Sequence, residues 1–307
     1  MKIVQGDQLP FEESRSIREG RIDKKYLFKG EEGSPANFVC GLYYQVNEFY
    51  APRHRHNFDQ WRFQLEGETH FGQSGTLKPG MLGYFPEGAY YGPNAADENT
   101  SKDLNGIVLI QFSGPSGGGY LSQVETYRAY EEMKQFGHFK DGVYYRNEGV
   151  PGKKTYDAFR ATWEYANKRT LIYPKPQYNA MIMMDTANYR WIPRAGAPGV
   201  EEKSLGVFSD CKVPAAQYKL DPGASFTAKG RGVYLVLSGR GTVEGEPFRR
   251  LTGLYVEAYE SGTFRAEETS EIMLFGLPDP TRMRQVLPDL ETADPEDLPA
   301  TDYVTTR

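Results

Sequence analysis

The sequence has little cysteine, no long apolar run and a deficit of positive charge. Its two cysteines, Cys40 and Cys211, are too few for a disulfide framework, so reduced thiols in a cytoplasmic protein are expected. No apolar stretch is long enough to cross a bilayer, and the N-terminus lacks the apolar core of a signal peptide. The net charge of −5 argues against nucleic-acid binding and a membrane-surface role.

Aromatic residues, glycine and proline are plentiful. The 307 residues include 22 Tyr, 17 Phe, 33 Gly and 20 Pro, a composition typical of short strands separated by turns. Strand candidates recur through residues 37–115 and again through residues 204–278. The sequence therefore predicts a fold dominated by β-structure, built as sandwiches or barrels.

The rest of the chain divides around these two blocks. Residues 1–36 are polar and mixed, and predict an arm with little regular structure. Residues 116–203 predict a partly helical connector, with helices expected within 121–136 and 155–169. Residues 279–307 are rich in Pro, Asp, Glu and Thr and predict a tail along the surface.

The two β blocks match each other in frame. The run from Arg62 through Gly67 to His70 aligns with the run from Tyr234 through Gly239 to Thr242. A second pair of turn-flanked runs follows in the same order at a similar separation. The pattern favours an internal duplication.

Histidine is scarce, yet two of the four histidines are only two residues apart. His54 and His56 lead into a strand candidate, where alternate side chains share a face. Two imidazoles roughly 6–7 Å apart along a strand can bind one metal ion. Taken alone, the pair is equally consistent with two solvated histidines on an exposed strand.

The spacing around this pair carries more information. One motif consists of His54, His56, Gln60 and Gly67, with one, three and six residues between successive members. A second motif consists of Gly80, Pro86, Gly88 and Tyr91, with five, one and two residues between successive members. In both motifs the chain resembles the cupin superfamily. The resemblance implies two cupin-type (double-stranded β-helix, or jelly-roll) barrels, at 37–115 and 204–278, with a partly helical connector.

The resemblance also implies a metal site in the first barrel. His54, His56 and Gln60 would bind one divalent transition metal, and the residue types allow Fe, Ni, Cu, Zn or Mn. Gln60 stands where the motif has Glu, and Tyr91 where it has a third His, so Tyr91 is open as a ligand, an acid or base, or a structural residue. In the second barrel the matching positions hold Phe226, Ala228 and Gly232, which predicts a degenerate barrel without metal.

Two further side chains are candidates for catalysis. Arg62 shares a strand face with Gln60, which makes it a candidate to bind a substrate carboxylate or enolate, or to pair with a barrel carboxylate. His70 is a candidate ligand or acid/base, or alternatively a surface histidine, because its strand face is undetermined.

The function expected is that of a metal-dependent cupin enzyme acting on a small oxygenated or carboxylated molecule. Both dioxygenase-type chemistry and isomerase, cyclase or lyase chemistry are open. The alternative is a non-catalytic ligand-binding or sensor protein. The expected partner is a small-molecule substrate, with an anion favoured because Gln60 brings no charge to the metal; a homodimer is compatible with the superfamily.

Overall fold

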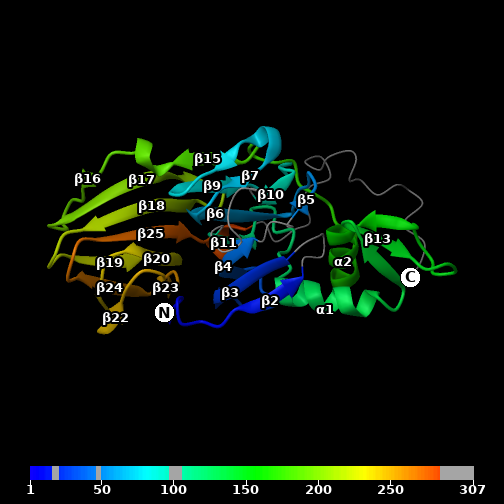
Figure 1. Cartoon of the computed structure of the whole chain (residues 1–307), viewed down its shortest axis with the longest axis horizontal. Coiled ribbons are helices and arrows are strands. Elements are labelled where there is room, and N and C mark those ends of the chain that lie inside the picture. Colours follow the sequence, from blue (N-terminus) through cyan, green and yellow to red (C-terminus); the bar gives the residue numbers. More distant parts are fainter. Residues whose placement is uncertain (16–20, 46–49, 97–105, 284–307) are drawn as a thin grey trace.

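The computed structural model describes residues 1–15, 21–45, 50–96 and 106–283. Three parts follow one another along the longest axis of Figure 1, with one barrel at the left, a second in the middle and a helical subdomain at the right. The β-dominated, two-barrel fold expected from the sequence is confirmed.

Each barrel contributes one seven-stranded antiparallel sheet. In the first barrel the strand order is β15 (Ile182–Asp185), β9 (Met81–Phe85), β6 (Phe58–Glu66), β11 (Gly106–Ser113), β4 (Phe38–Gln45), β3 (Arg21–Lys29), β2 (Glu12–Arg15). In the second barrel it is β1 (Lys2–Gln5), β23 (Thr252–Val256), β20 (Gly232–Ser238), β25 (Ser270–Gly276), β18 (Val213–Leu220), β17 (Val200–Phe208), β16 (Ile192–Pro193).

A smaller four-stranded sheet completes each barrel. The first barrel has β5 (Tyr50–Ala51), β10 (Asn94–Ala96), β7 (Thr69–His70) and β8 (Thr76–Leu77). The second has β19 (Ser225–Lys229), β24 (Ser261–Ala266), β21 (Gly241–Val243) and β22 (Glu246–Phe248). The central strands correspond one for one between the barrels, which is the arrangement expected of a duplicated unit.

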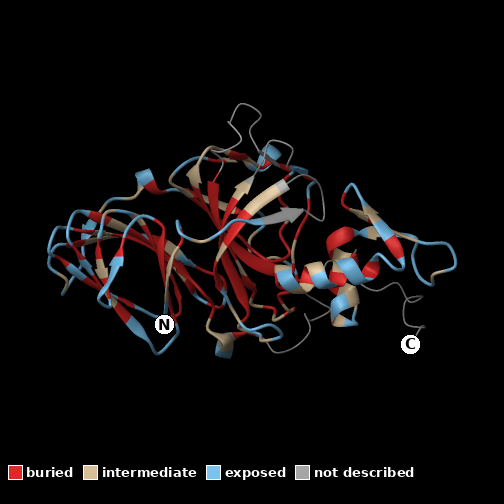
Figure 2. Cartoon of the chain, turned by 60° about the horizontal axis from the view of Figure 1, so that its bottom comes forward, coloured by how far each residue is buried: buried red, intermediate tan, exposed pale blue. Residues whose placement is uncertain are grey.

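The two large sheets pack face to face and share one apolar core. Strand β6 shows why: Trp61 and Phe63 alternate with polar residues and point away from the interior of their own barrel. The Trp61 ring packs edge-on against Phe208, and its Nε1 donates to the carbonyl oxygen of Gly276 at 2.9 Å. Figure 2 shows buried residues concentrated along these strands.

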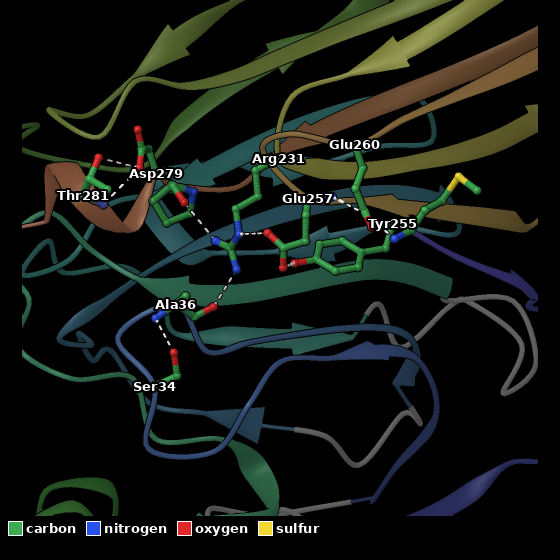
Figure 3. A network of polar contacts seen from close by, with 10 residues as sticks. Ser34, Ala36, Arg231, Tyr255, Glu257, Glu260, Asp279 and Thr281 are labelled. Atoms are coloured by element: carbon green, nitrogen blue, oxygen red, sulfur yellow. Dashed lines mark hydrogen bonds and ion pairs between the residues drawn. The ribbon is translucent and has the colours of Figure 1, made fainter.

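A buried arginine joins the barrels at the edge of this core (Figure 3). Arg231 donates to the carbonyl oxygens of Ala36, before β4, and Pro278, after β25, at 2.7 and 2.9 Å. Its Nε also lies 3.1 Å from the Glu257 carboxylate, which accepts the hydroxyl of Tyr255. A guanidinium suits this place because its planar donors can satisfy several acceptors at once.

The helical subdomain contains the two predicted helices and a small sheet. Helix α1 (Gln123–Met133) begins at a capping box formed by Ser122 and Glu125, and α2 (Ala158–Asn167) is capped by Asp157. The sheet comprises β12 (Gly137–Lys140), β13 (Val143–Arg146) and β14 (Thr155–Asp157), and 3₁₀ turns elsewhere span Gly72–Ser74, Thr186–Asn188 and Pro280–Arg282. None of the described helices is long and apolar enough to cross a membrane.

The N-terminal segment is not the irregular arm predicted for residues 1–36. Strand β1 pairs with β23 of the second barrel, and β3 pairs with β4 of the first. The prediction was wrong because polar residues of this segment are buried in the fold. Lys24 and Lys25 are both buried, with the ammonium group of Lys24 over the Tyr26 ring and that of Lys25 over the Phe11 ring.

The connector predicted at 116–203 also supplies sheet structure. Its residues 182–185 form β15, which pairs with β9 at the edge of the first barrel, and β17 already begins at Val200. Of the predicted tail 279–307, residues 284–307 lie outside the described residues.

Candidate functional site

The backbone of the first motif is fastened to that of the second. His54 and Tyr91 exchange two backbone hydrogen bonds of 3.0 Å each, and Gly88 N–H donates to the His56 carbonyl oxygen at 2.8 Å. These contacts fix both histidine backbones relative to Tyr91. The two motifs, separate in the sequence, therefore meet at one end of the first barrel.

Gly88 is required by this junction. Its φ of +77° lies in the region that favours glycine, and a Cβ there would approach the Pro174 carbonyl oxygen to 2.1 Å. The glycine lets the connector lie directly against the motif.

Four predicted side chains converge inside the first barrel. The ring centroids of His54 and His56 are 5.0 Å apart, and the Tyr91 ring lies 4.5 Å from His54 and 6.1 Å from His56. Gln60, fully buried, donates from Nε2 to the Tyr91 hydroxyl at 2.9 Å. The structure thus brings together the residues at all four ligand positions of the motif.

Arg62 lies in the same group. Its Nε and one terminal nitrogen lie 3.3 and 3.0 Å from Gln60 Oε1, and that terminal nitrogen lies 3.1 Å from the Tyr91 hydroxyl. Its guanidinium carbon lies within 4.5 to 5.4 Å of the ring centroids of Phe85, Tyr91 and Phe71. Arg62 is therefore held by two neutral acceptors and three aromatic rings.

The histidines fit a metal better than the other two residues do. His54 Nδ1 lies 2.6 Å from the Pro52 carbonyl oxygen, which can only accept, so in the neutral ring the lone pair is on Nε2. A backbone carbonyl oxygen that orients one ring nitrogen in this way is common among metal-binding histidines. Gln60 and Tyr91 do not fit, because their oxygens already accept hydrogen bonds around Arg62. Among the described residues, no three His, Cys, Asp or Glu side chains form a metal-binding group.

His70 does not join the site. Its neighbours in sequence, Thr69 and Phe71, are buried and face the barrel interior, where the Thr69 hydroxyl donates to Gln64 and Phe71 contacts Tyr91. By alternation His70 faces the other way, and its Nδ1 contacts the Thr76 hydroxyl at 2.9 Å. A catalytic role for His70 is not supported by this placement.

The helical subdomain adds a wall that sequence reasoning missed. Phe159 of α2 meets His56 edge-on at 4.7 Å, and Phe58 stacks on the same imidazole at 4.5 Å. No signal in the sequence connected α2 to the motif, because the contact spans about a hundred residues. The connector is therefore part of the site.

Positive charge also gathers beside the motif. The guanidinium carbons of Arg53 and Arg55, which alternate in the sequence with His54 and His56, each lie 4.5 Å from the Tyr90 ring centroid. With Arg62, this makes three arginines within ten residues of chain.

A second buried polar cluster lies on the other face of β6. Asp59 accepts the Tyr84 hydroxyl at 2.6 Å and the Glu87 backbone N–H at 2.8 Å, and burial raises the pKa of Asp59 to about 6. The Glu87 carboxylate in turn accepts the backbone and hydroxyl groups of Ser116. The cluster fastens the glycine-rich loop 113–119 to the second motif. Its only signal in the sequence was an acidic residue, Asp59, among the apolar residues on one face of β6.

Comparison with known proteins supports the fold. No family model and no curated protein matches the sequence. A "putative dioxygenase" from Nostoc punctiforme aligns with a TM-score of 0.59 at 11% identity, over 95% of this chain and 85% of that one. A mutant of Bacillus subtilis oxalate decarboxylase aligns with a TM-score of 0.50 at 12% identity, over 90% and 77%. The chain has the cupin fold, as the two motifs predicted.

Proposed function

We propose that the first barrel is the active site of an enzyme that acts on a small carboxylated or otherwise oxygenated molecule. One observation carries the proposal: His54, His56, Gln60, Arg62 and Tyr91 converge in the interior of the first barrel, while the interior of the second barrel is apolar. Buried polar groups are costly unless they are satisfied, so a polar set confined to one of two related barrels indicates function rather than packing.

The residues support proton transfer on an anionic substrate. His54 accepts a proton at Nε2, and its orientation is set by the Pro52 carbonyl oxygen. Tyr91 accepts from Gln60 and Arg62, which directs its own hydroxyl proton elsewhere, toward a bound substrate. Arg62 adds a fixed positive charge that stabilises a carboxylate or an enolate oxygen. This set favours isomerase or lyase chemistry.

A metal-dependent reaction, including a dioxygenase reaction, is the second candidate. It is favoured by the orientation of His54, which matches that of a metal-binding imidazole. In this version His54 and His56 hold a divalent transition metal, which supplies Lewis-acid or redox chemistry when bound.

Exchange of substrate hydrogen with solvent tests the proposal. We expect the protein to incorporate deuterium from D₂O next to the carbonyl of some members of a panel of oxo- and hydroxy-acids, and we expect Tyr91→Phe and His54→Gln to slow the exchange by roughly 10²–10⁴-fold. Phe226→Leu, at the matching position of the second barrel, is the control and leaves the rate unchanged. Binding without chemistry would identify a ligand-binding protein instead, whereas oxygen consumption would select the dioxygenase branch.

A further inference from the structure

The residues that depart from the metal-binding motif are the same two residues that hold Arg62. Gln60 replaces Glu and Tyr91 replaces His, and both contact the Arg62 guanidinium, at 3.0 and 3.1 Å.

The hydrogen bonds use the lone pairs that a metal would need. An amide oxygen and a phenol oxygen each have two acceptor positions. Gln60 Oε1 accepts from two nitrogens of Arg62, and the Tyr91 oxygen accepts from Gln60 Nε2 and from Arg62. With the guanidinium in place, neither oxygen has an acceptor position left for a metal ion.

The surroundings of Arg62 are also those of a bound cation. Phe71, Phe85 and Tyr91 present their rings to the guanidinium, and the side chain is only 6% exposed. A divalent ion between Gln60 and Tyr91 would meet this fixed charge at close range, in surroundings that screen it weakly.

We infer that the Arg62 guanidinium takes the place of the metal ion, so that the first barrel has a cationic centre without a metal. Arg62 supplies permanently the positive charge that an ion supplies in a metal-binding barrel, since an arginine stays protonated. Gln60 and Tyr91 are suited to this role because both are neutral acceptors for its N–H groups. The inference concerns the same site as the proposed function but does not depend on catalysis.

Metal titration of the whole protein tests the inference. We expect the purified wild type to hold no stoichiometric transition metal, and to show no binding of Ni²⁺ or Zn²⁺ by calorimetry that depends on His54. We expect Arg62→Met and Arg62→Gln to bind one equivalent of ion at least about tenfold more tightly than the wild type, because both remove the guanidinium and its charge, and Arg62→Met also frees the Gln60 and Tyr91 oxygens. Arg62→Gln keeps a polar group beside Gln60 and Tyr91, should the methionine variant fold poorly.

Two further variants assign the site. His54→Ala added to Arg62→Met should abolish the gained binding, whereas His70→Ala added to it should leave the binding intact. Stoichiometric, His54-dependent metal in the wild type would overturn the inference without any variant, and so would folded Arg62 variants that bind no better than the wild type. Deuterium exchange measured in the presence of a chelator is a separate result: its absence counts against the proposed function and leaves the metal result standing.

Discussion

The two barrels share strand order and register but differ in what fills them. His54 pairs with Tyr91 in the first barrel as Phe226 pairs with Phe264 in the second. The matched interior positions, first barrel first, are His54 and Phe226, His56 and Ala228, Gln60 and Gly232, Arg62 and Tyr234, Gln64 and Val236, and Tyr91 and Phe264.

This difference separates scaffold from site. In the second barrel the interior is a packed apolar core, and the hydroxyl of Tyr234 is turned aside to the Lys229 carbonyl oxygen. In the first barrel the same positions hold a connected set of polar groups. The apolar core shared by the two large sheets contains residues of both barrels, so both barrels contribute to stability. The first barrel can therefore keep a polar interior, because apolar packing between the sheets stabilises it.

The largest expected effect on stability lies in the apolar barrel. Phe264 is fully buried against Phe226 and Phe248, so Phe264→Ala should lower the free energy of unfolding by about 3–5 kcal/mol. Urea denaturation measures the change. Val207→Ala, on an exposed side chain of the same barrel, is the control and should change stability by no more than about 0.5 kcal/mol. A small loss for Phe264→Ala would mean that the second barrel is not a tightly packed scaffold.

The two barrels also differ in the charge carried by matching outer strands, β3 and β17. Lys24 on β3 is paired with Tyr43, whereas the matching position on β17 is Glu202, paired with Tyr218 and bridged to Arg194. Burial lowers the pKa of Lys24 to about 8 because it disfavours the charged ammonium. In the unfolded chain a lysine titrates near 10.4, so the unfolded chain binds more protons between these values.

Stability should therefore rise as the pH increases from about 8 to about 10.4, because Lys24 is neutralised first in the folded protein. Below pH 8 its charge costs at most about 3 kcal/mol. Lys24→Met should remove this contribution, raising stability at pH 7 by about 1–3 kcal/mol and flattening the rise in pH-dependent denaturation curves. Lys29→Met, on an exposed lysine of the same strand, should leave the rise in place.

The sequence predicted the inner strands and the motif better than the outer strands. The motif spacing is local and fixes turns, so it located His54, His56, Gln60 and Tyr91 together. Strand β1 was missed because its partner β23 lies far away in the sequence, and β3 was missed because it buries lysines that read as a solvated surface.

Within the site, the sequence could not always predict which face of a strand a side chain occupies. Alternation from Gln60 predicted that Arg62 shares its face, and their hydrogen bond agrees. It could not assign the face of His70, because nothing in the sequence shows that Thr69 contacts Gln64 of β6, which belongs to the other sheet of the barrel. The contact of Arg62 with Tyr91, which bears on metal binding, joins two motifs and follows only from the fold.

A modest change in stability should accompany the largest change in function, at Tyr91. Tyr91→Phe keeps the ring but removes the oxygen that accepts from Gln60 and Arg62, which should cost about 1–3 kcal/mol as two buried donors lose an acceptor. Tyr84→Phe on the opposite face is the matched control, since it removes a hydrogen bond to Asp59 at a similar depth. Both variants should lose comparable stability in urea, but only Tyr91→Phe should lose ligand binding by calorimetry and deuterium exchange by NMR. Equal functional losses in the two variants would show that the polar interior of the first barrel acts through stability alone, and the contrast between the barrels would then be one of packing rather than of function.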